Sequence, residues 1–163
     1  IVLVIGKTEG HIDQSLFARN ILDEKNGPPP EINLFNEKNN GETLLKLIES
    51  GYIKSAHDIS LGGIITAISK MCIKGNKGIN LKKPNFLINE IEYFFSEDQG
   101  RYIIEITKKN LNKVTNLLIK NAVHFDELGI INDKELHINE KTKVTIDELR
   151  TSNTSWLTEY MSK

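Results

Sequence analysis

Residues 55–72 read SAHDISLGGIITAISKMC, a stretch that runs from a strand-like segment through two glycines into a helix. We expect a short strand over residues 53–57, a tight polar turn, and a helix that begins near Ser60. The apolar residues of this helix recur on one face, which predicts that the face is buried. They are Ile64, Ile65, Ile68, Met71 and Cys72. The stretch therefore predicts a strand, a turn and a helix in direct succession.

Further strand-like and helical segments interleave along the chain without strict alternation. Strands are expected at residues 1–5, 92–96 and 101–106, and across residues 123–144 with turns near Gly129 and at Asn132-Asp133. Helices are expected over residues 11–22, around Leu44 to Ile48 with an end at Gly51, around Leu111 to Leu118, and after Thr145, which forms a capping-box pattern with Glu148. This order favours an α+β fold, a mixed sheet packed with helices, over a doubly wound parallel sheet.

The composition is that of one ordinary globular domain. The 163 residues are 39% hydrophobic and 26% charged, and the formal net charge is −1. This balance argues against a nucleic-acid-binding protein, which needs an excess of Lys and Arg for its phosphate contacts. No apolar run approaches the ~20 residues that cross a bilayer, so no membrane association is expected either.

Cys72 is the single cysteine, which excludes an internal disulfide and a thiolate zinc cluster. A reducing, cytoplasmic setting is expected for such a chain. Its place among the apolar residues of the expected helix favours a packed hydrophobic role over that of a nucleophile. The chain starts at Ile1, without Met and already inside a strand-like run. We therefore expect residues 1–163 to be a single domain cut from a longer chain.

The opening segment IVLVIGKTEG (residues 1–10) contains Gly6-Lys7-Thr8, which resembles the end of the P-loop pattern. That pattern needs a further glycine five positions before Gly6, where this chain has Ile1. The run before the glycine is wholly apolar and mostly β-branched, as is typical of a strand buried on both faces. We therefore interpret the segment as a core strand that ends in a turn.

The turn between the strand and the helix of residues 55–72 is the first candidate site. The first backbone N–H groups of a helix lack internal partners and carry the positive end of its dipole, and Gly62 and Gly63 would let an anion approach them closely. Asp58, just before these groups, is a candidate ligand for a magnesium ion that bridges to phosphate oxygens. In the alternative interpretation, Asp58 or Ser60 caps the helix and the glycines relieve packing against the sheet.

The second candidate site is FFSEDQGRY, residues 94–102. Glu97 and Asp98 lie in an expected turn, where carboxylates can hold a metal ion or a substrate hydroxyl. Arg101 could bind phosphate through its planar guanidinium. The alternative is a solvated turn with an incidental arginine.

Three segments of the sequence together form a recognisable pattern. They are VLVIGKTEGH at residues 2–11, GPPPEINLFNEKNNGETLLKLIESGYIKSAHDISLGG at residues 27–63, and FFSEDQGRYIIEI at residues 94–106. With these blocks in this order, the chain resembles the last domain of the phosphoribosylformylglycinamidine synthase family, the second C-terminal-type domain of a synthetase in the aminoimidazole ribonucleotide synthetase-like superfamily. The likeness extends to WLTEYM at residues 156–161 and so covers essentially the whole chain. It implies an α+β domain with a mixed sheet.

The resemblance implies an ATP-dependent ligase of purine biosynthesis as the parent enzyme. In this family ATP phosphorylates the amide oxygen of formylglycinamide ribonucleotide, and ammonia from glutamine hydrolysis then displaces phosphate to give the amidine. Magnesium ions neutralise the transferring phosphate. The family's reaction centre lies mainly in other domains. The resemblance therefore implies no catalytic residue in this chain, a largely structural role, and no activity of the chain in isolation.

The resemblance also implies binding roles through the internal pseudo-symmetry of the family. Asp58 matches a magnesium-binding aspartate, and Glu97 and Asp98, with Ser96, match a substrate-contacting block. The residues implied to contact a nucleotide are Ser60, Gly62, Gly63, Glu97 and Asp98. The family block His-Asp-x-Ser-Asp-Gly-Gly has Leu61 here in place of its second Asp, which removes one oxygen ligand. ATP and Mg²⁺ are therefore expected in the parent enzyme, and weak or absent binding is expected for this chain alone.

Three kinds of partner are implied: the remaining domains of the same synthetase, a separate glutaminase subunit and a small bridging subunit. If Lys163, directly after the expected last helix, is the natural end of the chain, the parent protein resembles the short bacterial form of the synthetase. Two other hypotheses stay open. One is a free-standing ATP-dependent, kinase-like enzyme of the superfamily, although the domain type that holds ATP is missing. The other is a non-catalytic module that docks the glutaminase or the bridging subunit.

Overall fold

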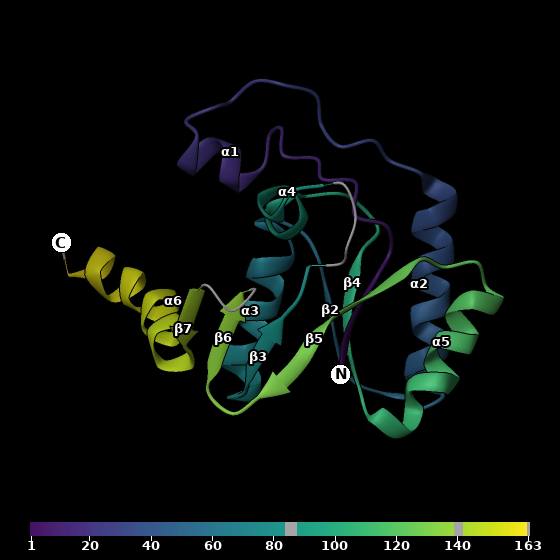
Figure 1. The fold of residues 1–163 in the computed structure, drawn as a ribbon. Coiled ribbons are helices and arrows are strands. Elements are labelled where there is room, and N and C mark those ends of the chain that lie inside the picture. The colour runs from purple at the N-terminus through teal and green to yellow at the C-terminus, as the bar shows by residue number, and fades with distance from the viewer. Residues whose placement is uncertain (84–87, 139–141, 163) are drawn as a thin grey trace.

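The computed structural model describes residues 1–83, 88–138 and 142–162 of the chain, and Figure 1 shows their arrangement. Within these residues a seven-stranded sheet runs in the order β2-β4-β1-β5-β3-β6-β7. The strands are β1 Val2–Ile5, β2 Ile53–Asp58, β3 Gly78–Leu81, β4 Tyr102–Ile106, β5 Phe125–Asn132, β6 Glu135–Ile138 and β7 Thr142–Thr145. Strands β3 and β6 pair in parallel, and the other neighbours pair antiparallel, so the sheet is mixed as predicted.

Helices cover both faces of the central strands. They are α1 Leu16–Ile21, α2 Leu34–Glu49, α3 Gly63–Gly75, α4 Glu90–Phe95, α5 Leu111–Lys120 and α6 Ile146–Met161, with a short 3-10 helix, η1 Lys108–Asn110. Helices α2 and α5 lie on one face of the sheet, and α3 and α4 lie on the other (Figure 1). The α+β fold predicted from the sequence is thereby confirmed. None of these helices combines the length and the apolar character that crossing a membrane requires.

Strand β1 lies inside the sheet, between β4 and β5. Val2 and Val4 belong to the core beneath α3, whereas Leu3 and Ile5 belong to the core beneath α2 and α5. Because successive side chains of a strand point to opposite faces, a strand covered on both faces needs apolar residues at every position. Gly6 follows with a positive φ of 92° and begins a turn. The interpretation of this segment as a core strand, and not a phosphate loop, is confirmed.

The strand expected over residues 92–96 is wrong, because these residues belong to α4 and its C-terminal end. Asn89 caps α4 by accepting a hydrogen bond from the Glu92 N–H, while the Glu92 carboxylate accepts one from the Asn89 N–H. Tyr93 and Phe94 are buried in the core shared with α3. Aromatic residues favour strands, but a capping box ahead of them starts a helix, and here the cap and the packing decide.

The turn expected near Gly129 is also wrong. Gly129 lies inside β5, paired with Leu81 of β3 on one side and with Val2 of β1 on the other. A Cβ at this position would clash with the carbonyl oxygen of Asn80, so this glycine permits a close approach of strands and not a turn. The turn expected at Asn132-Asp133 is confirmed, because it joins β5 to β6.

Several helices were placed correctly but differ in extent from the expectation. Helix α1 is shorter, because Ser15 caps it by accepting from the Ala18 N–H. Helix α2 begins well before Leu44, at the cap formed by Asn33. The capping box that starts α6, between Thr145 and Glu148, is confirmed.

Cys72 lies in the core beneath α3, which agrees with the expected packing role. Burial raises the pKa of its thiol to about 11, because the apolar surroundings disfavour the thiolate. At mildly alkaline pH we expect Cys72 to react with a disulfide reagent about a hundredfold more slowly in the native chain than in the urea-unfolded chain. The absorbance of the released thiol measures both rates. Equal rates would contradict the burial of this thiol.

Candidate functional site

The turn between β2 and α3 holds the glycines of the first candidate site. Gly62 and Gly63 have positive φ angles of 82° and 69°, a conformation that residues with a side chain rarely adopt. The Gly63 N–H donates to the carbonyl oxygen of Ser60 at 3.0 Å, so the turn is closed by its own backbone. The N–H of Gly62, the N-cap residue of α3, is directed at the neighbouring loop.

Glu97 accepts this N–H group. Its Oε1 atom lies 2.8 Å from the Gly62 nitrogen and 2.8 Å from the nitrogen of Leu16, the first residue of α1. One carboxylate oxygen therefore contacts the N-terminal ends of two helices, where unpaired N–H groups and the helix dipole favour a negative charge. The Glu97 N–H itself donates to the carbonyl oxygen of His11 at 3.1 Å. A carboxylate of the chain thus stands where an external anion was expected.

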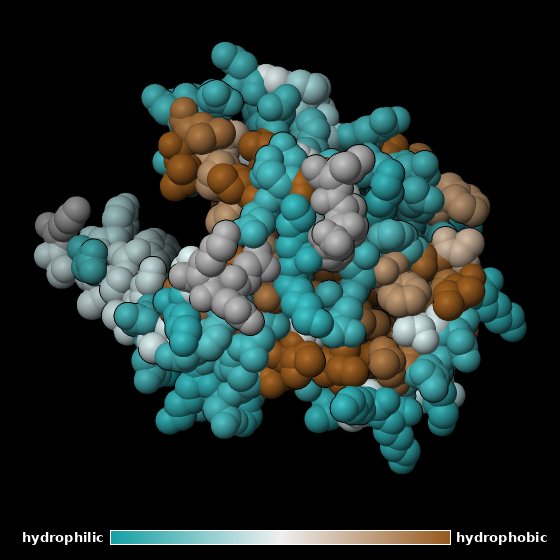
Figure 2. Space-filling model, viewed as in Figure 1, coloured by the Kyte–Doolittle hydropathy of each residue, from teal (hydrophilic) through white to brown (hydrophobic). Residues whose placement is uncertain are grey.

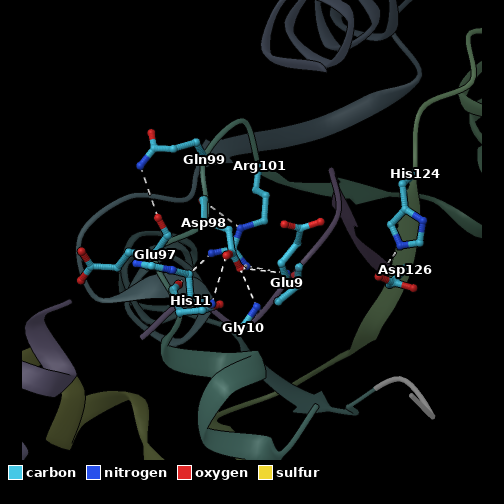
Figure 3. A network of polar contacts seen from close by, with 11 residues as sticks. Glu9, Gly10, His11, Glu97, Asp98, Gln99, Arg101, His124 and Asp126 are labelled. Atoms are coloured by element: carbon cyan, nitrogen blue, oxygen red, sulfur yellow. Dashed lines mark hydrogen bonds and ion pairs between the residues drawn. The ribbon is translucent and has the colours of Figure 1, made fainter. Parts of the chain in front are cut away.

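Asp98 is 6% exposed and binds the loop that follows β1, as Figure 3 shows. Its Oδ2 accepts from the N–H groups of Glu9 and Gly10 at 3.0 and 3.1 Å, and its Oδ1 accepts from the N–H of His11 at 3.1 Å. Hydrogen bonds to an ionised carboxylate are roughly twice as strong as those between neutral groups. Asp98 therefore fixes the backbone of residues 9–11.

Arg101 is 1% exposed and closes the same loop from the inside. Its Nε donates to the Asp98 carbonyl oxygen at 3.1 Å, its Nη1 to the Thr8 hydroxyl at 3.0 Å, and its Nη2 to the Ser96 carbonyl oxygen at 2.7 Å. Burial lowers the pKa of Arg101, and the carboxylate of Asp98, whose Oδ2 lies 3.6 Å from Nη1, opposes that shift. The guanidinium is closed off from solvent, so the interpretation of Arg101 as a phosphate ligand is wrong.

Asp58 and Ser60 lie apart from this network. Asp58 ends β2 with 66% of its side chain exposed, and its Oδ1 lies 3.3 Å from Nδ1 of His57. Ser60 and Leu61 are exposed as well. In the described part of the chain, no group of three or more His, Cys, Asp or Glu side chains is arranged to hold a metal ion. A magnesium site built from this chain alone does not fit these residues, and Asp58 as a metal ligand stays a prediction.

The residues implied to contact a nucleotide fall into two sets. The structure brings Gly62 and Glu97 together, and it buries Asp98 in the adjoining loop. Ser60 is left in solvent. The N–H groups of Gly62 and Gly63 both have partners within the chain, so a phosphate could reach the Gly62 N–H only if Glu97 moved. Nucleotide binding by these residues therefore stays a prediction, and the present geometry does not fit it.

The structural roles of three buried polar residues of this region were not predicted from the sequence, although the resemblance placed Ser96 in a substrate-contacting block. Thr8, Ser15 and Ser96 are 5%, 0% and 0% exposed. Thr8 accepts from Arg101, Ser15 caps α1, and Ser96 supplies a carbonyl oxygen to Arg101. Only Ser15 carried a signal in the sequence, as a capping residue directly before an apolar helix start. The other two depend on contacts between distant segments.

Comparison with known sequences gives the family of the chain. Residues 1–141 match the sequence pattern described as AIR synthase related protein, C-terminal domain. The chain is 71% identical over 161 residues to the phosphoribosylformylglycinamidine synthase subunit PurL of Pelagibacter ubique, an alignment that covers 99% of this chain and 22% of that protein. It is 36% identical over 162 residues to the subunit of the same name from Bartonella henselae, with the same coverage of 99% and 22%. The chain thus spans about a fifth of the length of the curated relatives that it matches.

Solved structures share the fold. Thermotoga maritima PurL complexed with FGAR superimposes with a TM-score of 0.71 at 19% identity, over 91% of this chain and 27% of that one. The thiamine-monophosphate kinase of Stenotrophomonas maltophilia gives a TM-score of 0.56 at 12% identity, over 85% of this chain and 49% of that one. At these identities the likeness concerns the fold alone. With its fold and the sequence pattern of residues 1–141 in agreement, the chain belongs to the family of AIR synthase related proteins, C-terminal domain.

Proposed function

We propose that the chain is the last C-terminal-type domain of a phosphoribosylformylglycinamidine synthase, the ATP-dependent ligase that converts formylglycinamide ribonucleotide and ammonia to the amidine in purine biosynthesis. The observation that carries this proposal is the 71% identity to a PurL subunit over 161 residues. Thermotoga maritima PurL, which has the same fold, has been solved in complex with ATP and with FGAR. The partners that we propose are the remaining domains of the synthetase, a separate glutaminase and a small bridging subunit. A PurLQS structure from Thermotoga maritima supports an assembly of this kind.

Within that enzyme we assign the chain a largely structural role. Glu97, Asp98 and Arg101 direct their charged groups at the chain's own backbone and at one another. Groups engaged in this way hold loops together, and they are not available to a substrate. We therefore place the binding of ATP, Mg²⁺ and formylglycinamide ribonucleotide mainly in other domains, to which Asp58 could add a single exposed carboxylate.

A domain exchange tests the proposed function. Replacing the matching segment of Pelagibacter ubique PurL with this chain is expected to give a synthetase with nearly the activity of the parent, because the two sequences are 71% identical over 161 residues. ATP-dependent formation of formylglycinamidine ribonucleotide, with ammonium as the nitrogen source, measures the activity. A second exchange that carries Arg101→Leu serves as the control for a strongly destabilised domain. A soluble, stably folded chimera that forms no product would overturn the proposal.

Calorimetric titration tests the structural role. We expect no saturable heat when Mg-ADP is added to the isolated chain at millimolar concentration, because the Gly62 N–H is already bonded to Glu97. The Glu97→Ala variant, which lacks the carboxylate bonded to the Gly62 N–H, is titrated in the same way, and its heat is compared with that of the unmodified chain. Saturable binding to the unmodified chain that is lost in Asp58→Ala would show instead that this domain holds a nucleotide site of its own.

A further inference from the structure

Helix α6 begins on the body of the domain and ends away from it (Figure 1). Ile146 is buried and Leu149 packs on the core beneath α3. The next residue is Arg150, whose Nη2 contacts Oδ1 of Asn76 at 2.8 Å. None of residues 151–162 is buried in the structure. The rest of the helix with its C-cap Ser162, which we call the distal half (residues 151–162), thus has little support from its own domain.

The distal half continues the apolar stripe that packs the first half. At 3.6 residues per turn, Ile146, Leu149 and Trp156 lie on one side of the helix, and the next apolar residues follow on the same side. The exposed fractions are 61% for Trp156, 50% for Leu157, 71% for Tyr160 and 74% for Met161. One face of α6 is therefore core at its start and uncovered at its end.

The composition of the distal half is that of a covered surface. Residues 151–158 contain no charged side chain. Figure 2 shows the projecting end of α6 mostly in pale tones, unlike the teal of much of the remaining surface, and a deep notch separates it from the body. Charged residues are depleted at the centre of protein interfaces, where Trp, Tyr and Met are enriched. The distal half has this pattern on its apolar side.

The helix itself also needs a partner. Residues 151–155 read TSNTS, and Thr, Ser and Asn are poor helix formers because their side chains compete with the backbone for hydrogen bonds. Most helical stability in proteins comes from the packing of an apolar face. A solvent-exposed half-helix of this composition would fray unless its apolar face were covered.

The comparisons indicate where the covering surface comes from. The family pattern ends at residue 141, before α6 begins, whereas the alignment with the PurL subunit of Pelagibacter ubique extends over 161 residues. Helix α6 is therefore shared with the longer PurL proteins and is not part of the general domain pattern. Those proteins contain much more chain, since this one covers 22% of their length. A surface on the same polypeptide meets α6 at a high effective concentration.

We propose that the distal half of α6 packs its stripe of Trp156, Leu157, Tyr160 and Met161 on an apolar surface of another domain of the same longer polypeptide. This proposal rests on the proposed function, because that function supplies the further domains. In this proposal α6 connects two domains: its first residues pack on its own domain, and its distal half packs on the other domain.

Hydrogen exchange of the isolated chain and of full-length Pelagibacter ubique PurL tests the docking. We expect residues 151–162 to exchange almost without protection in the isolated chain, and the matching residues of the full-length protein to exchange about tenfold or more slowly. Fast exchange in both proteins would overturn the proposal. So would slow exchange in the isolated chain together with a dimer by light scattering, because the occupant would then be a second copy.

Paired substitutions in the chimera locate the contact on the apolar stripe. Trp156→Ala with Tyr160→Ala is expected to lower the Tm of the chimera by several degrees and to leave the Tm of the isolated chain unchanged. Thr151→Ala with Thr158→Ala, on the other side of the helix, is the matched control and is expected to lower neither, since both pairs raise helix propensity. If Trp156→Ala with Tyr160→Ala left the Tm of the chimera unchanged, the proposed docking would be contradicted. An inactive chimera that keeps its protected helix would count against the proposed function alone.

Discussion

Replacing Arg101 with leucine is expected to lower the free energy of unfolding of the isolated chain by about 3–5 kcal/mol. The substitution removes the donors to the Thr8 hydroxyl and to the carbonyl oxygens of Ser96 and Asp98. It also leaves the buried carboxylate of Asp98 without its neighbouring positive charge. Domains of this size are stable by only about 5–15 kcal/mol, so the variant would be marginally folded. Urea unfolding followed by circular dichroism measures the change.

Arg150→Leu is the matched control for this experiment. Arg150 pairs with Asp147 at the surface, where an ion pair contributes less than about 1 kcal/mol. Adding Asp98→Asn to Arg101→Leu removes the buried charge, but the amide nitrogen cannot accept a backbone N–H as the carboxylate does, so at most a partial recovery is expected. A loss below about 1 kcal/mol for Arg101→Leu alone would show that the buried guanidinium does not hold the loop.

Gly63→Ala is expected to destabilise the chain by about 2–5 kcal/mol, the sum of a backbone cost and a steric cost. The backbone cost arises because Gly63 has a φ of +69°, which an alanine adopts only under strain. The steric cost arises because the new Cβ would lie 2.6 Å from the carbonyl oxygen of Ser96 and 2.7 Å from that of Phe94. The end of α4 would have to move away from α3. The midpoint of thermal unfolding and the urea midpoint both measure the effect.

The same helix offers the control. Gly75, the last residue of α3, would place a Cβ with nothing within 4 Å. Gly75→Ala is therefore expected to be neutral or to stabilise the chain by up to about 1 kcal/mol, because alanine is the better helix former. Equal effects of the two substitutions would contradict the close contact between α3 and the end of α4.

The fold class and the unit formed by residues 53–75 could be predicted because each depends on local patterns. The β-branched run of β1 predicts a strand that is buried on both faces, and the apolar stripe of α3 predicts a helix that is buried on one face. Strand β3, with only four residues from Gly78 to Leu81, was not predicted from the sequence. Helix α4 was mistaken for a strand, because the aromatic run outweighed the capping pattern that starts at Asn89.

The candidate site could be predicted only in part. The sequence pointed to Glu97 and Asp98 as special, and both residues do sit at the centre of a polar network. A carboxylate that binds a ligand and one that binds backbone N–H groups look the same in a sequence. The difference is set by where residues 8–11 and Leu16 lie, which depends on pairing between segments far apart in the chain.

The position of Glu97 has a consequence for the stability of the domain. A bound nucleotide or phosphate stabilises a native state by an amount that grows with the logarithm of its concentration. The carboxylate at the start of α3 belongs to the polypeptide, so its hydrogen bonds to Gly62 and Leu16 are the same at every metabolite level. The contribution of these hydrogen bonds to the stability of the module is therefore built into the chain and does not depend on the concentration of a bound anion.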